Sequence, residues 1–247
     1  IQPLGHTRGN QNYDCPVMIL VDKLSASASE ILAGAFQDYK RGLVVGSNTF
    51  GKGTVQRLET LAYGQLKFTE QKFYRVSGKS TQNLGVAPDI FLPYVFDNEE
   101  VGEMSLENSL PYDDISSVDF KPFDSTSNIE MIQNFSKKRV SDSNLNEYIK
   151  DQKNQNFVEL NKKLIPVNYL VRKSEKKAQE EKRLFIENRF RVSQGLKPFL
   201  NFQDFLDSDP EEFNELSEKI VLEEAARILI DQINLNKPNR LSSSDFR

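Results

Sequence analysis

The chain has 247 residues, of which 38% are hydrophobic and 28% are charged, with a formal net charge of −4. This length allows one large domain or two smaller ones, and the mildly acidic balance argues against a nucleic-acid-binding protein with a dominant basic face. The longest apolar run covers residues 16–21, far short of the roughly 18 residues that suggest a membrane span, so we expect none.

Cysteine and histidine each occur once, as Cys15 and His6. A single cysteine allows no internal disulfide and argues against a zinc cluster, so we expect neither a metal nor a cofactor. A histidine-based hydrolytic site would have to use His6, which lies in a polar, glycine-containing segment typical of a loop. If the chain carries hydrolytic chemistry, we therefore expect its base to be another residue.

The N-terminal end has no signal-peptide pattern, because Ile1-Gln-Pro-Leu-Gly is neither basic nor followed by an apolar core. It also lacks an initiator methionine. We therefore interpret the sequence as a fragment or a processed product of a longer protein.

Residues 16–22, 28–39 and 43–45 form the first predicted unit. The two outer segments are short apolar runs typical of buried strands, and the middle segment has helical spacing. A strand, helix, strand order with apolar strands predicts a parallel βαβ unit. The helix should pack through one face, which consists of Ala28, Ile31, Leu32, Ala35, Phe36 and Tyr39.

A hairpin is predicted next. Residues 54–61 and 65–74 alternate in the manner of strands, and Ala62-Tyr63-Gly64 is typical of the turn between them. Residues 85–93 predict a turn that leads into a last short extended segment. Residues 1–95 are therefore expected to form one α/β unit.

The composition changes after about residue 95. Residues 96–127 contain Pro111, Pro122 and several serines and aspartates, which indicates a linker or an irregular wrap. Residues 128–247 should then form an α-helical domain. Asp209-Pro210 predicts the start of its last helix, which should run to about Asn234. The second half of this helix is apolar nearly all round, which predicts burial between neighbours.

Ser27, Lys52 and Gln56 are the candidate catalytic residues. A serine hydroxyl becomes a good nucleophile only when a base removes its proton, and a buried, neutral lysine amine can act as that base. Lys52 lies between Gly51 and Gly53, which let the backbone fold tightly around it. Gln56 can hold the amine through its side-chain oxygen without adding a negative charge. We therefore predict a nucleophile, a base and an orienting residue.

The predicted helix start can also stabilise an oxyanion, with the backbone N–H of Ala28 as the donor. Simpler interpretations remain open. Ser27-x-x-Glu30 is a capping-box pattern, so Ser27 could merely cap the helix. Lys52 could be a solvated loop lysine, and Gln56 a polar strand residue.

A nucleotide-binding interpretation competes with the hydrolytic one. Residues 46–52 match the first seven positions of a phosphate-binding loop and follow a predicted strand. The eighth position is Gly53 instead of serine or threonine, and the next segment alternates as a strand. A phosphate loop instead opens a helix. Both features disfavour a nucleotide site.

Three motifs in order carry a family resemblance: Ser25-Ala-Ser-Ala-Ser-Glu-Ile31, Phe50-Gly-Lys-Gly-Thr-Val-Gln56 and Gly85-Val-Ala-Pro-Asp-Ile90. With Lys52 placed 25 residues after Ser27, they resemble the carboxyl-terminal processing proteases, specifically the tail-specific protease (Prc) branch of Gram-negative bacteria. The resemblance selects Ser27 over the neighbouring serines. Residues 107–115 and 167–172 are similar to the helical C-terminal extension of that branch.

The resemblance implies an α/β fold, with a partial crotonase/ClpP-like βαβ protease core and a β-hairpin followed by an α-helical C-terminal domain. It implies a Ser27–Lys52–Gln56 site with Ala28 in the oxyanion hole. The implied function is that of a periplasmic serine endopeptidase that forms an acyl-enzyme. Its partners would be protein or peptide substrates with nonpolar C-termini and an adaptor protein, and no nucleic acid.

Parts of the family pattern are absent from these residues. Family members carry, before this point, a signal peptide, a helical N-terminal region, a PDZ domain and the first half of the protease fold. That half is expected to supply a second oxyanion donor and part of the substrate cleft. The alternative is therefore an inactive fragment that acts as a structural or adaptor-binding module.

Overall fold

The computed structural model describes residues 13, 15–93, 101–123, 126–162 and 164–236. The side chains of residue 160 and of residues 210–214 are also outside what is described. His6 and most of the predicted N-terminal loop therefore lie outside the described residues.

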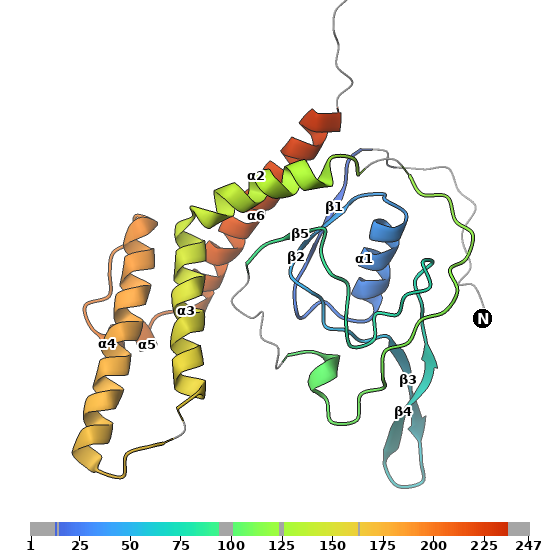
Figure 1. Cartoon of the computed structure of the whole chain (residues 1–247). Helices are drawn as coiled ribbons and strands as arrows, with labels where there is room; N and C mark the ends of the chain where they lie inside the picture. The colour runs from blue at the N-terminus through green and yellow to red at the C-terminus, as the bar shows by residue number, and fades with distance from the viewer. Residues whose placement is uncertain (1–12, 14, 94–100, 124–125, 163, 237–247) are drawn as a thin grey trace, which may run out of the picture.

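A three-stranded parallel sheet is the centre of the N-terminal part (Figure 1). Its strands are β1 (Met18–Val21), β2 (Leu43–Gly46) and β5 (Ile90–Phe91), in the order β1-β2-β5. Helix α1 (Ala28–Asp38) connects β1 to β2, and the two strands pair in parallel. The predicted βαβ unit is confirmed. All four residues of β2 are buried, as expected for a central strand whose two faces are both covered.

The sheet lies between two helical layers. Val44 packs on the side of α1, in a cluster with Val21, Ala33 and Val86. Val45 packs on the opposite side, in a cluster to which helices α2 (Ile129–Ser141) and α6 (Pro210–Asn236) contribute. Figure 1 shows α1 on one side of the sheet and α2 with α6 on the other. The C-terminal helices therefore complete the core of the N-terminal sheet.

The predicted packing face of α1 is wrong in its N-terminal half. Its buried residues are Glu30, Ala33 and Gly34, whereas Ile31 and Leu32 are exposed. Small residues are favoured on the buried face because neighbours approach closely there. A Cβ added at Gly34 would lie 3.1 Å from the Arg75 side chain. Glu30 is buried because its carboxylate is fully hydrogen-bonded, which apolar periodicity cannot reveal.

The predicted hairpin is confirmed as β3 (Thr54–Thr60) and β4 (Gln65–Lys72), which pair antiparallel with an irregularity between Val55 and Gln56. It projects from the sheet as a two-stranded arm (Figure 1). Most of its side chains are exposed, and Tyr63 in the turn is 98% exposed. The hairpin therefore contacts the rest of the described chain mainly at its base.

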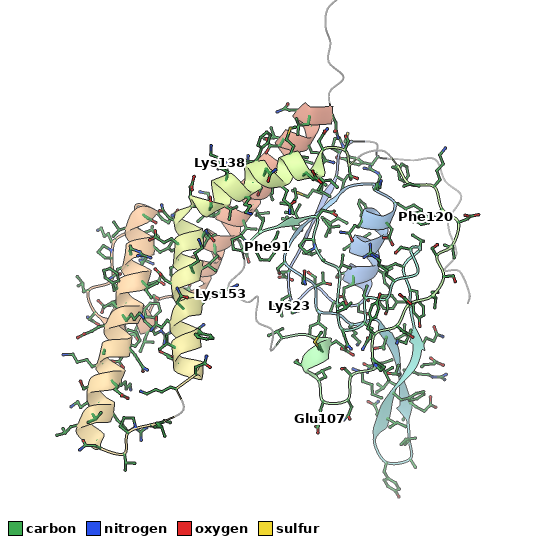
Figure 2. All side chains as sticks on the ribbon, in the orientation of Figure 1. Lys23, Phe91, Glu107, Phe120, Lys138 and Lys153 are labelled. Atoms are coloured by element: carbon green, nitrogen blue, oxygen red, sulfur yellow. The ribbon has the colours of Figure 1, made fainter. Side chains whose placement is uncertain are left out.

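Within its described residues, the predicted irregular wrap contains a short 3-10 helix, η1 (Glu103–Ser105). We call residues 102–114 the C-terminal strap. It lies against the end of β4, where Lys72 Nζ donates to Asp113 Oδ1 at 2.6 Å and Tyr74 Oη donates to Asp113 Oδ2 at 2.9 Å. Lys23, labelled in Figure 2, approaches its first residue, Gly102.

The remaining elements are helical, as predicted: α2, α3 (Asn144–Leu160), α4 (Tyr169–Ser193), α5 (Phe202–Leu206) and α6. Helix α6 begins at Pro210 as predicted and ends at Asn236. Its predicted burial all round is wrong, because Leu222 is 57% and Ile230 is 54% exposed. Among the described side chains of α6, Ala225 and Ile228 are buried on the side that meets the sheet and the other helices.

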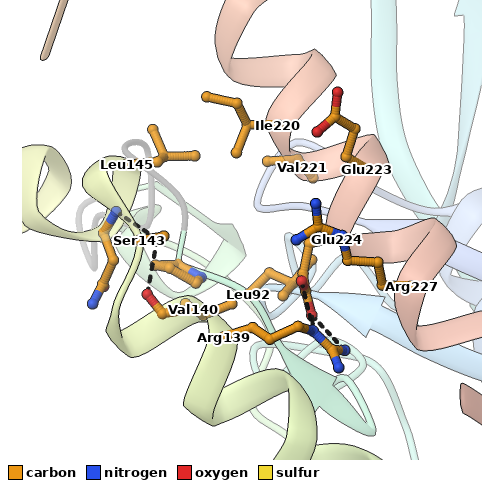
Figure 3. Close-up of a pocket in the computed structure, with 12 residues that line it drawn as sticks. Leu92, Arg139, Val140, Ser143, Leu145, Ile220, Val221, Glu223, Glu224 and Arg227 are labelled. Atoms are coloured by element: carbon orange, nitrogen blue, oxygen red, sulfur yellow. Dashed lines mark hydrogen bonds and ion pairs between the residues drawn. The ribbon is translucent and has the colours of Figure 1, made fainter. Parts of the chain in front are cut away.

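A small pocket of about 90 Å³ lies where the end of the sheet meets α2, α3 and α6 (Figure 3). Leu92 and Leu145 line it, and Arg139 and Glu224 form an ion pair at its edge. None of the helices in the described ranges combines the length and the apolar character needed to cross a bilayer.

Candidate active site

Ser27 has an unusual backbone conformation, with φ 56° and ψ −111°. It is the residue between the turn after β1 and the first residue of α1. A residue other than glycine with a positive φ is strained, and such backbone strain clusters at functional sites. The turn is held by Asp22, whose Oδ1 accepts from the backbone N–H and the hydroxyl of Ser25, both at 2.8 Å.

Ser27 and Glu30 form a capping box at the start of α1. The Ser27 N–H donates to Glu30 Oε2 at 2.8 Å, and the Glu30 N–H donates to the Ser27 carbonyl oxygen at 2.9 Å. Glu30 therefore fixes the backbone of Ser27 at the start of the helix.

The Glu30 carboxylate links the serine turn to the lysine. Its Oε2 accepts from the Ser27 N–H at 2.8 Å and from the Lys52 N–H at 2.9 Å. Its Oε1 accepts from the Gly51 N–H at 2.7 Å and from the Thr49 hydroxyl at 2.6 Å. Because Ser27 and Lys52 share one acceptor oxygen, their backbone nitrogens cannot be farther apart than the sum of those two distances.

This carboxylate is fully buried. Burial raises the pKa of Glu30 above its ordinary value, and the hydrogen bonds from Thr49, Gly51, Ser27 and Lys52 oppose that shift. Four donors converging on two oxygens is the full complement that an ionised carboxylate can accept. Glu30 therefore has the partners that a buried charge needs.

Lys52 and Gln56 lie together as predicted, with Lys52 Nζ donating to Gln56 Oε1 at 3.2 Å. Gln56 directly follows the strand irregularity in β3. Lys52 is half-buried and Gln56 is exposed. Among the hydrogen bonds of the described residues, none joins the Ser27 hydroxyl to the Lys52 amine, so the two residues are brought together through their backbones.

Ala28 occupies the first position of α1, and its N–H makes no hydrogen bond within the described part of the chain. Such a donor at a helix N-terminus is available to an anion. Ala28 therefore lies where its N–H can face a ligand beside Ser27.

The loop around the lysine does not have the structure of a phosphate loop. It leads into strand β3, whereas a phosphate loop opens a helix. Its backbone donors are also occupied, because Gly51 and Lys52 donate to Glu30 and Gly53 donates to Gln82 Oε1 at 2.9 Å. The nucleotide-binding interpretation is therefore wrong.

Two buried side chains near the site were not among the predicted residues. Glu30 was considered only as a capping residue, although its position three after Ser27 was a usable signal. Gln82 gave no signal, since its role depends on contacts far away in sequence. Within the described ranges there is no group of three or more metal-ligating side chains that could hold an ion.

Comparisons with known families divide the chain in two. Residues 3–92 match peptidase family S41, and residues 96–234 match the C-terminal domain of tail specific protease (DUF3340). The chain is 33% identical to the tail-specific protease of Haemophilus influenzae over 255 residues, which covers 95% of this chain and 35% of that protein.

Other relatives match mainly the N-terminal part. The carboxy-terminal-processing protease of Bartonella bacilliformis is 43% identical over 83 residues, covering 33% of this chain and 19% of that protein. A solved structure of the photosystem II D1 C-terminal processing protease is 42% identical, with a TM-score of 0.30, over 31% of this chain and 20% of that chain.

The chain thus spans about a third of the length of the tail-specific protease and a smaller share of the other relatives. One family model covers more than half of the chain, and the second covers nearly all of what precedes it. The chain therefore belongs to the tail-specific protease family, with a peptidase family S41 region followed by the C-terminal domain of these proteases.

Proposed function

We propose that this chain is the C-terminal portion of a periplasmic serine endopeptidase in which Ser27 is the nucleophile, Lys52 the general base and Gln56 the residue that orients the lysine. The observation that carries the proposal is the Glu30 carboxylate, which accepts from the backbones of both Ser27 and Lys52. The Lys52–Gln56 hydrogen bond supports the orienting role.

In the proposed reaction, Lys52 Nζ accepts the proton of the Ser27 hydroxyl as the serine oxygen attacks the scissile carbonyl carbon. The carbonyl oxygen becomes an oxyanion, for which the Ala28 N–H is one donor. The lysine then returns the proton to the leaving amine, which leaves an acyl-enzyme on Ser27. Water, activated by the same amine, releases the acyl group and restores the serine.

The substrates proposed for the whole protein are proteins recognised by nonpolar C-terminal tails. Tail-specific and carboxy-terminal-processing proteases are the relatives that support this class. The division into a protease portion (residues 1–95), a linker (96–127) and a helical domain (128–247) is part of the same proposal, with an adaptor protein as a second kind of partner.

The proposal is tested by covalent labelling of the whole protein with a serine-directed phosphonylating reagent, followed by peptide mapping. We expect a single label on Ser27 and none in the Ser27→Ala variant. Ser29→Ala is the matched control, because Ser29 is exposed two residues further on and should leave labelling intact. A label on another serine, or equal labelling of Ser27→Ala, would overturn the assignment.

A second candidate is a binding module without proteolytic activity, favoured by the capping box that Ser27 and Glu30 form at the start of α1. Incubating the purified 247-residue chain with a peptide that has a nonpolar C-terminus separates the two. Cleavage that Ser27→Ala abolishes would rule out the inactive module. Intact peptide, with turnover by the whole protein, would support the module for this chain alone.

A further inference from the structure

Gln82 is a buried amide beside the lysine. It is 0% exposed, and its Oε1 accepts from the N–H of Gly53 at 2.9 Å. The approach is close, because a Cβ added at Gly53 would lie 2.7 Å from the backbone nitrogen of Gln82. This contact gives Gly53 a fixed partner immediately after Lys52.

The other end of the same amide holds the C-terminal strap. Gln82 Nε2 donates to the Leu110 carbonyl oxygen at 3.0 Å and lies 3.3 Å from Glu103 Oε1, which accepts from it. Glu103 is itself buried, and its N–H donates to the Phe50 carbonyl oxygen at 3.0 Å. The C-terminal strap therefore contacts Phe50 directly and Gly53 through Gln82, on the two sides of Lys52.

These contacts complete the fixation of the lysine loop, which we define as residues 51–53. Glu30 holds the N–H groups of Gly51 and Lys52 from the side of the serine, and Gln82 holds that of Gly53 from the side of the strap. A shift of Gly53 would move Lys52 relative to both Gln56 and the serine turn. Small displacements of this kind can lower a rate by about a hundredfold.

We propose that Gln82 is a positioning residue that couples the C-terminal strap to the backbone of the lysine loop. The strap belongs to the tail-specific C-terminal match, whereas the lysine belongs to the peptidase match. The C-terminal domain thereby sets the geometry of the base. This inference rests on the proposed function, since it assumes that Lys52 acts on Ser27.

The test is a set of variants in the whole protein. Gln82→Glu keeps an oxygen for the Gly53 N–H but places a second carboxylate against Glu103 and loses the donor to Leu110. Glu103→Gln keeps an acceptor for Gln82 and should lower the rate less. The double variant restores a donor between the two side chains. Gln133→Glu, at an exposed position in α2, is the matched control for the same chemical change.

The readout separates positioning from folding. The final amount of label per protein molecule counts folded sites, whereas the rate constant of Ser27 labelling reports the geometry of each site. We expect Gln82→Glu to lower the rate constant by roughly 10–100-fold while the final amount of label stays the same. The double variant should recover most of that loss in rate. The control should match the wild type.

Four results would contradict the proposal or the function on which it rests. An unchanged rate constant in Gln82→Glu would overturn the positioning role while leaving the proposed function intact. A loss confined to the final amount of label would do the same. A double variant no faster than Gln82→Glu would overturn the coupling to the strap. Failure of the wild type to label at Ser27 would refute the proposed function instead.

Discussion

At the scale of single residues, Glu30 joins the two halves of the proposed site. One buried carboxylate accepts hydrogen bonds from Thr49, Gly51, Lys52 and Ser27. Its position in the first turn of α1 also places a negative charge at the positive end of the helix. A glutamate at this position therefore fixes the relative placement of Ser27 and Lys52 without contacting the reacting atoms.

Glu30→Gln should separate placement from chemistry. The amide nitrogen of glutamine would face backbone N–H donors, so at least one buried donor would lose its acceptor. We expect the free energy of unfolding to fall by about 1–3 kcal/mol and the rate of Ser27 labelling to fall by roughly 100-fold. Chemical denaturation and labelling kinetics measure both. Glu130→Gln, exposed in α2, is the control, and equal behaviour of the two variants would contradict the role of Glu30.

The site residues differ in whether the sequence alone could predict their contacts. Lys52 and Gln56 were predicted to meet, and they do, since Gln56 lies four positions after Lys52, next to the strand irregularity in β3. The roles of Glu30 and Gln82 could not be predicted in the same way. Each depends on neighbours more than 20 residues away, which only the folded chain brings together.

At the scale of elements, the strands and helices follow from local patterns, but their buried faces do not. Short apolar runs predicted β1 and β2 correctly, since few other structures bury such runs. The predicted packing face of α1 was wrong in its N-terminal half, because hydrophobicity ranked Ile31 and Leu32 above Glu30 and Gly34. Close packing and hydrogen bonding decided the orientation of the helix instead.

The C-terminal strap gives a pH-dependent prediction. The hydrogen bond from Lys72, with a second from Tyr74, lowers the pKa of Asp113 below its ordinary value. A lowered carboxyl pKa stabilises the folded state above the pKa of the unfolded chain, and this contribution is lost as the pH falls through the folded-state value. The docked strap should therefore be stabilised at about pH 5 and above.

Thermal unfolding of the wild type and Asp113→Asn between about pH 2 and pH 6 measures this contribution. The variant should melt at a lower temperature at the upper end of this range, and the two curves should converge at the lower end. Asp119→Asn, an exposed position just beyond the strap, should follow the wild type throughout. A constant difference between the wild type and Asp113→Asn at every pH would contradict the role of the charge.

At the scale of the whole molecule, the peptidase and C-terminal portions share one hydrophobic core. Leu43 and Ile90 from the sheet pack with Ile132 of α2 and Ile228 of α6, all essentially inaccessible to solvent. Removing α2 and α6 would expose this face of the sheet to water. The C-terminal domain is therefore part of what stabilises the portion that carries Ser27 and Lys52.

Arg139 tests the contact between α2 and α6, the two C-terminal helices that cover the sheet. Its guanidinium joins α2 to α6 through Glu224 at 2.8 Å and Asp231 at 2.9 Å. Arg139→Met would leave two carboxylates without their cation, so we expect the free energy of unfolding to fall by about 1–3 kcal/mol. Urea denaturation checks this value. Lys138→Met, exposed on the same helix (Figure 2), is the control, and an equal loss in both variants would contradict the role of the ion pairs.

The most direct test of the central claim compares the rate of Ser27 labelling in the whole wild-type protein with that in Lys52→Ala, in the presence of the same reagent at neutral pH. If Lys52 is the base for Ser27, the rate constant should fall by about 10²–10⁴-fold while the thermal midpoint stays close to that of the wild type. Labelling of Ser27 in Lys52→Ala at an undiminished rate would contradict the account.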